Sequence, residues 1–251
     1  MALKEARLFD ARESRAVMRE VFNQSSSNLE LLSLAELEIV DARMTSLCHK
    51  HEETLIFNIG AEVTVEVEGK AYKLAHYDVL YITRGAEFAI QAGTEPGKLY
   101  IYRAKAEKEH PVQHMQWAAM KDDPTRIRLL NRKKVHLMFD VADQSDRFMA
   151  GYTFYQDHSR AWPPHNHTDQ EECYSFIEGK GAMQVYPDDE NTFFVKNVEV
   201  GSHVTIPLLN YHPVFSHDEP LCFIWCIAGE RYWVGDKSKA FMDGTASKVT
   251  T

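Results

Sequence analysis

Short segments in which apolar and polar residues alternate, separated by glycine and asparagine turn signals, fill most of this chain. In residues 62–68 polar and apolar side chains alternate almost without a break. Gly69-Lys70 is a turn signal before residues 71–74. Successive side chains of a β-strand point to opposite faces, so this pattern predicts strands with one buried face. Many short strands at close spacing predict a sandwich or barrel, and we therefore expect an all-β fold.

The same criteria predict strands in both halves of the chain, with few helices among them. The two expected helices are residues 10–23, which carry a modest apolar stripe, and a short one near residues 117–120. The further expected strands are residues 79–83, 88–90, 99–102, 135–139, 148–155, 173–177, 182–186, 193–195, 203–206 and 221–227.

The two halves of the chain resemble each other. His49-Lys50-His51 precedes Glu53-x6-Gly60, and His165-Asn166-His167 precedes Glu172-x6-Gly179. The separation between the two glutamates and that between the two glycines are both 119 residues. Repetition on this scale predicts two related β domains in one chain.

A candidate metal site stands in the second half. His165 and His167, two residues apart on an extended segment, face the same side. Glu172 follows them, and His212 comes from a later strand. Three imidazoles and one carboxylate can hold a divalent transition metal and still leave one or two positions open for substrate.

The first half lacks a complete copy of this ligand set. His212 lies 11 residues after Gly201, which begins the segment Gly201-x5-Pro207, and the same distance from the matching Asp78 leads to Ala89. We therefore expect the chemistry in the second half. For His49, His51 and Glu53 we favour polar residues in a pocket or at a contact between domains, with a second metal as the alternative.

These observations divide the chain into four segments. We expect residues 1–29 to be a helix and lead-in, residues 30–107 a first β domain without a full metal site, residues 108–126 a connector, and residues 127–251 the metal-binding β domain.

Charge and hydrophobicity exclude several classes of partner. The formal net charge is −9 and the isoelectric point is about 5.7, whereas nucleic-acid binding requires a basic face. No apolar run approaches the length of a membrane span, and the first 20 residues lack the apolar core of a signal peptide. The four cysteines form no CxxC pair. We expect a cytoplasmic protein that binds neither nucleic acid nor membrane.

The metal-site pattern resembles the two motifs of the cupin superfamily. The first is His165-x-His167-x4-Glu172-x6-Gly179, and the second is Gly201-x5-Pro207-x4-His212. The resemblance extends over residues 48–229. It implies a tandem cupin, with two β-sandwich or jelly-roll barrels in one chain and a few short helices. Cupins host many activities, so the fold alone does not determine the function.

A narrower resemblance is to the 5-keto-4-deoxyuronate isomerases. It is carried by Phe57-Asn-Ile-Gly60, Val65-Glu-Val-Glu-Gly69, Tyr72-Lys-Leu74, Asp78-Val-Leu-Tyr81, Arg84-Gly85, Lys108-Glu-His-Pro111, Leu130-Asn-Arg132, Phe223-Ile-Trp225 and Ala228-Gly-Glu230. Two further segments, Pro163-Pro-His165 and Tyr211-His-Pro213, are more similar to 5-deoxyglucuronate isomerase.

This resemblance implies a metal-dependent ketol-isomerase, an intramolecular oxidoreductase of bacterial carbohydrate metabolism that acts on an acidic, uronate-type sugar through an enediol. It also implies one divalent metal per chain, with zinc expected and manganese or iron as alternatives, and a homo-oligomer, either a dimer or a hexamer. The acidic stretch Thr168-Asp-Gln-Glu171 stands where that family has a basic one, and its Thr-Arg-His segment is absent. These departures put the substrate in doubt more than the reaction type.

Isomerisation also requires a group that moves a proton, and an acidic sugar requires a cation for its carboxylate. The acid/base candidates are Glu171, Tyr174, Tyr211 and His217. The candidates for the carboxylate-binding cation are Arg231 and Lys196. Sequence alone gives each of these an equally simple role in packing or solvation.

Three alternative functions remain open at this stage. An isomerase of another hexuronate or modified sugar differs only in its pocket. A cupin dioxygenase predicts a redox metal, oxygen consumption and an apolar aromatic pocket. A non-catalytic sugar-binding cupin predicts stabilisation by ligand without turnover.

Overall fold

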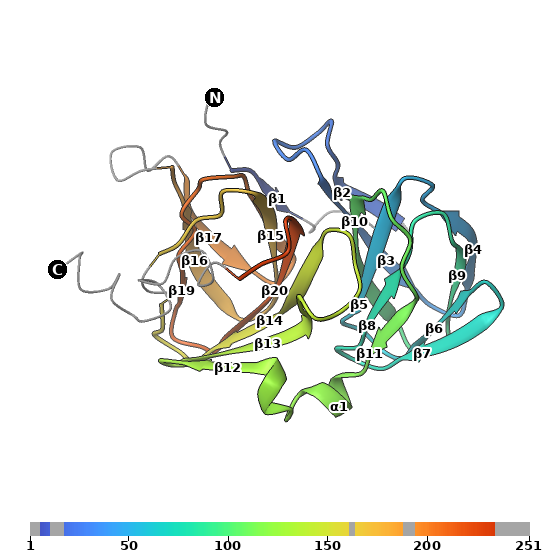
Figure 1. Ribbon diagram of the computed structural model, residues 1–251. Helices are drawn as coiled ribbons and strands as arrows, with labels where there is room; N and C mark the ends of the chain where they lie inside the picture. Colours follow the sequence, from blue (N-terminus) through green and yellow to red (C-terminus); the bar gives the residue numbers. More distant parts are fainter. Residues whose placement is uncertain (1–5, 11–17, 161–163, 188–193, 234–251) are drawn as a thin grey trace.

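A computed structural model describes residues 6–10, 18–160, 164–187 and 194–233 (Figure 1). Four β-sheets account for most of these residues, and two sheets belong mainly to each half of the chain. Figure 1 shows the two halves side by side, with the short helix of the connector below them. The fold is the predicted all-β tandem barrel.

The first half consists of a six-stranded and a four-stranded sheet. The larger sheet has the order β11-β8-β5-β10-β3-β2 and the smaller one β4-β9-β6-β7. Their strands are β2 (Met18–Phe22), β3 (Leu32–Ile39), β4 (Arg43–Cys48), β5 (Glu52–Asn58), β6 (Val63–Val67), β7 (Lys70–Leu74), β8 (Val79–Ile82), β9 (Glu87–Ala92), β10 (Gly97–Lys105) and β11 (Gln113–Met115).

The second half consists of a seven-stranded and a three-stranded sheet. The larger sheet has the order β1-β18-β15-β20-β14-β13-β12 and the smaller one β17-β16-β19. Their strands are β1 (Leu8–Asp10), β12 (Ile127–Leu130), β13 (Lys133–Phe139), β14 (Phe148–Tyr155), β15 (Gln170–Glu178), β16 (Lys180–Val185), β17 (Phe194–Glu199), β18 (Ser202–Ile206), β19 (Val214–Ser216) and β20 (Leu221–Gly229).

The helices are short. Helix α1 (Trp117–Met120) lies where a short helix is expected, and a 3₁₀ turn, η1 (Pro124–Arg126), follows it. Among the described residues no helix is long and apolar enough to cross a membrane.

The expected helix over residues 10–23 is wrong where the structure describes it, and residues 11–17 lie outside the described residues. Residues Met18–Phe22 form β2, an edge strand paired with β3. The apolar stripe was weak, whereas pairing with the open edge of β3 satisfies the backbone and buries Phe22. Earlier in the chain, β1 pairs with β18 of the second half.

Three apolar clusters stabilise this arrangement. One fills the first barrel, around Val65 and Ile90, and another fills the second barrel, around Phe176 and Trp225. The third lies between the barrels and is built from both halves of the chain. The cysteines Cys173, Cys222 and Cys226 are buried in this third cluster as free thiols. The two barrels therefore share one continuous interface core.

Candidate metal centre

Three histidines converge inside the second barrel. His165 and His167 precede β15, and His212 lies between β18 and β19. One ring nitrogen from each lies within 4.8 Å of the others. The ring centroids are 4.4 Å apart for His165 and His212, 5.1 Å for His165 and His167, and 5.2 Å for His167 and His212.

Glu172 completes the cluster from β15. Its Oε2 lies 3.3 Å from Nε2 of His167 and 3.2 Å from Nε2 of His212. The carboxylate is 3% exposed, and the facing residue pairs Glu172–Ile227 and Glu172–Ile206 fix its place in the sheet. The structure thus brings together the four residues expected to bind the metal.

The converging nitrogen and oxygen atoms are better suited to bind a divalent cation than to hydrogen-bond to one another. Oε2 of Glu172 and Nε2 of both His167 and His212 are buried and lack a hydrogen bond of acceptable geometry. Buried polar atoms without partners are costly, and one ion at the point where they converge would satisfy all of them. Three nitrogens and a carboxylate oxygen are ligands that zinc, manganese and iron accept.

Backbone contacts fix the orientation of the cluster. Nδ1 of His212 lies 2.9 Å from the carbonyl oxygen of Asn210. Donation to that oxygen places the proton on Nδ1 and leaves Nε2 free as a ligand. The amide of Leu209 donates to the carbonyl oxygen of His167 at 2.7 Å, which joins the two motifs. Leu209 adopts a φ of 65° in the turn that leads to His212.

The protonation states also suit metal binding. Burial, followed by the neighbouring His212 and His167, lowers the pKa of His165 well below its usual range. Burial alone would raise the pKa of Glu172, but the adjacent imidazoles of His167 and His212 leave it lowered. A neutral imidazole and an ionised carboxylate are the ligand forms of these groups.

An aromatic wall extends from the cluster into the barrel. The Tyr174 ring lies 5.6 Å from that of His212 and stacks on Phe223 at 4.4 Å. Tyr155 then meets Phe223 edge-on at 5.7 Å. Burial raises the pKa of Tyr174 well above its usual range, so its hydroxyl stays protonated at neutral pH. Tyr174 is thus the acid/base candidate whose ring contacts the cluster.

Tyr211 lies beside the cluster along the chain. It precedes His212 and stacks on Tyr186 at 5.5 Å, and the backbones of the two tyrosines form a bridge. These contacts place Tyr211 at the end of the antiparallel pair β16–β19, next to the histidines of the cluster.

Two acid/base candidates do not belong to this cluster. The Glu171 carboxylate points to the opposite face of β15 and accepts the amides of Glu30 (2.6 Å), Leu31 (2.8 Å) and Leu32 (3.3 Å). His217 is exposed at the far end of the antiparallel pair β16–β19, where its amide donates to the carbonyl oxygen of Lys180. Both interpretations relied on sequence proximity, which does not reveal the face or the end of a strand on which a side chain lies.

The two expected carboxylate-binding cations are also placed elsewhere. Arg231 donates to the carbonyl oxygens of Phe148 (2.9 Å), Ser145 (3.1 Å) and Asp140 and so secures the loop before β14. Lys196 is exposed on the edge strand β17. No sequence motif marks Lys133, a half-buried lysine on the inner face of the barrel. Its position became visible only through the register of β13 with β14.

In the first half, Glu53 points away from the barrel interior. It accepts hydrogen bonds from the Tyr81 hydroxyl (2.8 Å), the Ser145 hydroxyl (3.0 Å) and the amides of Asp146 (2.9 Å) and Arg147 (2.7 Å). Glu53 therefore lies at a contact between the two halves, as the favoured interpretation of this residue expected. His49 packs near Phe88, and the described residues contain no second group of three converging metal ligands.

A β-bulge in β15 explains why Glu53 and Glu172, which have the same spacing to Gly60 and Gly179, point to different faces of their sheets. The pairing of β15 with β20 shifts between Phe176 and Glu178. Glu53 and Leu55 of β5 face the interface core, as do Glu171 and Cys173 of β15, whereas Glu172 faces the barrel interior. Glu53 therefore corresponds in orientation to Glu171, because one inserted residue reverses the faces of a strand.

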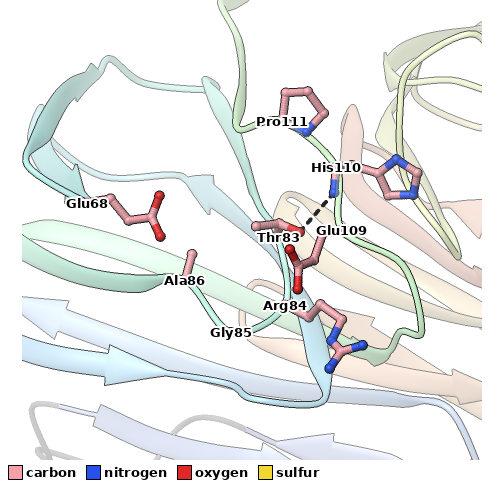
Figure 2. A pocket seen from close by; sticks show the side chains of 8 residues that line it. All are labelled: Glu68, Thr83, Arg84, Gly85, Ala86, Glu109, His110 and Pro111. Atoms are coloured by element: carbon pink, nitrogen blue, oxygen red, sulfur yellow. Dashed lines mark hydrogen bonds between the residues drawn. The ribbon is translucent and has the colours of Figure 1, made fainter.

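A polar surface pocket lies in the first half, away from the candidate metal cluster (Figure 2). Its lining includes Arg84, whose guanidinium donates to the carbonyl oxygens of Lys50 and Glu107. Figure 2 also shows the amide of His110 donating to the Thr83 hydroxyl at 3.0 Å. The pocket contains none of the residues of the metal cluster.

The two jelly-roll-like barrels and the ligand cluster in the second one define a bicupin. Comparison with known proteins assigns it more narrowly: residues 4–243 match the model of the KduI/IolB family, and the chain belongs to that family.

Among curated relatives, the chain is 27% identical over 253 residues to the 4-deoxy-L-threo-5-hexosulose-uronate ketol-isomerase of Bacillus pumilus, covering 95% of this chain and 87% of the relative. It is 28% identical to the enzyme of the same name from Bacillus subtilis, covering 83% and 78%.

Solved structures confirm the fold. An IolB-like protein from Salmonella typhimurium superposes with a TM-score of 0.73 at 15% identity, covering 90% of this chain and 94% of that one. The S161A mutant of Bacillus subtilis oxalate decarboxylase gives a TM-score of 0.73 at 15% identity, covering 93% and 79%.

Proposed function

We propose that this protein is a ketol-isomerase of an acidic, uronate-type sugar and that it works at a divalent metal held by His165, His167, Glu172 and His212. The observation that carries the proposal is the convergence of three histidine nitrogens and a Glu172 oxygen within the second barrel. Of these atoms, Nε2 of His167, Nε2 of His212 and Oε2 of Glu172 are buried without a hydrogen-bond partner. The names of the curated relatives support the reaction type and the substrate class.

Aldose–ketose interconversion removes a proton next to a carbonyl and returns one to the neighbouring carbon, through an anionic enediolate. A divalent cation in this site would supply positive charge beside the carbonyl and hydroxyl oxygens. The protonated hydroxyl of Tyr174 fits a hydrogen-bond donor to a substrate oxygen rather than a base. The aromatic wall of Tyr174, Phe223 and Tyr155 excludes water from one side of the sugar.

We further propose one ion per chain, with zinc first and manganese or iron as alternatives, because all three accept this ligand set. The expectation of a homo-oligomer, a dimer or a hexamer, stays a prediction.

Proton NMR in deuterated water tests the function. Zinc- or manganese-loaded protein is incubated with 4-deoxy-L-threo-5-hexosulose-uronate, 5-deoxyglucuronate and a panel of hexuronates. We expect isomerisation of an acidic sugar with deuterium entering at the carbon next to the carbonyl. Absence of turnover and exchange with either metal would overturn the proposal. Oxygen uptake by the iron form would then favour a dioxygenase, and stabilisation by sugar without turnover a binding protein.

Variants link the activity to the ligand cluster. His212→Ala should lose bound metal, measured by elemental analysis, and activity, while its circular dichroism spectrum stays that of the parent protein. The control is His217→Ala, which replaces an exposed histidine at the far end of the β16–β19 strand pair and should keep both metal and activity. A metal-free and fully active His212→Ala protein would contradict the assignment.

A further inference from the structure

Lys133 lies on the inner face of the metal-binding barrel. In the register of the seven-stranded sheet, Lys133 pairs with Tyr155, and Tyr155 pairs with Leu221. Tyr155 and Leu221 belong to the core of the second barrel, as does Ile227, the partner of Glu172. Paired residues share a face of a sheet, so Lys133 points into the same interior as Glu172.

Lys133 has no anionic partner among the described residues. Its Nζ lies over the Tyr155 ring, 5.7 Å from the centroid. Two other cations of this half are paired with carboxylates, Arg126 with Asp143 and Arg132 with Asp157. Burial lowers the pKa of Lys133 to about 8, which still leaves it mainly charged at neutral pH. A half-buried cation without an anion is costly to desolvate, and an anionic ligand would offset that cost.

The aromatic wall connects this lysine to the metal cluster. From Lys133, the ring contacts run through Tyr155, Phe223 and Tyr174 to His212, with centroid separations of 5.7, 4.4 and 5.6 Å between successive rings. Lys133 and the cluster thus lie along one wall of one barrel interior.

We propose that Lys133 binds the carboxylate of the acidic sugar and determines specificity for uronates over neutral sugars. This inference rests on the proposed function. A uronate carries its carboxylate at the end of the carbon chain opposite the aldehyde. A sugar lying along the aromatic wall would place its reacting oxygens at the histidines and its carboxylate at the ammonium. Lys133 is a positioning residue here, because it acts on the end of the substrate that does not react.

The test compares Lys133→Met with Lys134→Met in the metal-loaded protein. Methionine keeps the unbranched packing over Tyr155 but removes the charge. Lys134 is the adjacent residue on the opposite face of β13 and serves as the matched control. For the uronate, Lys133→Met should raise KM about 10- to 100-fold with a smaller change in kcat, since a charge-assisted hydrogen bond is lost. Lys133→Arg should recover part of that loss.

Binding provides a readout that does not depend on turnover. Calorimetric titration with D-galacturonate and with neutral D-galactose should show weaker binding of the acid alone in Lys133→Met, with metal content unchanged. If the parent protein isomerises uronates but Lys133→Met keeps its KM and its galacturonate affinity, the Lys133 inference is overturned and the function stands.

If the parent protein binds galacturonate in a Lys133-dependent manner without isomerising any sugar, the function fails and the Lys133 inference stands. Loss of metal in Lys133→Met would overturn the inference, because it would assign the residue to the integrity of the cluster. Circular dichroism of both methionine variants and of Lys133→Arg verifies that each has folded.

Discussion

Glu171 and Glu172 are neighbours on β15 that face opposite sides of one sheet. Glu172 lies with the histidines, whereas Glu171 accepts three backbone amides from residues 30–32. The spacing of the histidines and Glu172 was sufficient to predict the four-residue cluster. The role of Glu171 could not be predicted, because its partners are about 140 residues away in the chain.

This pair of glutamates supports a prediction with an internal control. Glu172→Gln should weaken metal binding by more than about 100-fold, since a charged ligand becomes a neutral one, with little loss of stability in the metal-free protein. Glu171→Gln should keep its metal but lose about 1–3 kcal/mol of unfolding free energy, because an amide group then faces backbone donors. Metal titration and urea unfolding of both variants measure this. Loss of metal in Glu171→Gln and loss of stability in Glu172→Gln would contradict the assignment of Glu172 as the metal ligand and Glu171 as the structural acceptor.

Strands and the short helix could be predicted from the sequence wherever the spacing of apolar residues matched one type of element. Residues 148–155 match β14, and the short helix at residues 117–120 matches α1. The interpretation of residues 10–23 was wrong at β2, because the pairing that decides it comes from β3. Lys133 was missed for the same reason: its neighbours Tyr155 and Leu221 become evident only from pairing across strands.

The packing of α1 against β13 makes stability depend on pH. Trp117 of α1 lies 4.6 Å from the ring of His136, and burial lowers the pKa of His136 to about 4. Lys134 lowers this pKa further, whereas Asp122 opposes it. The folded protein keeps His136 neutral while the unfolded chain takes up a proton, so its contribution to stability is complete above about pH 6.5 and is lost towards pH 4.

Replacing His136 measures how much of the pH dependence of stability comes from this residue. His136→Phe fits the aromatic surroundings of Trp117 and Phe154 and cannot be protonated. Urea unfolding between pH 7 and 4 should therefore show a shallower loss of stability in the variant than in the parent protein. His217→Phe, at an exposed histidine, is the control for replacing a histidine by phenylalanine. Parallel curves for parent and His136→Phe would assign the acid sensitivity to other groups.

The whole molecule is joined by its interface core and by two buried glutamates that act reciprocally. Glu53 of the first barrel accepts donors from residues 145–147, and Glu171 of the second barrel accepts donors from residues 30–32. Tyr102 and Ser175 are hydrogen-bonded across the same interface. Each half therefore depends on the other to satisfy buried polar groups and to cover apolar surface.

This dependence predicts how the protein responds to metal. Metal bound to the native state alone stabilises it, by about 2.7 kcal/mol at 100 times the dissociation constant. Because the barrels share a core, we expect one calorimetric transition, shifted upwards as a whole by zinc and returned by a chelator. Glu172→Gln should show no shift. Two separate transitions, with only one of them sensitive to metal, would mean that the interface is too weak to couple the barrels and that the first barrel folds independently of the second.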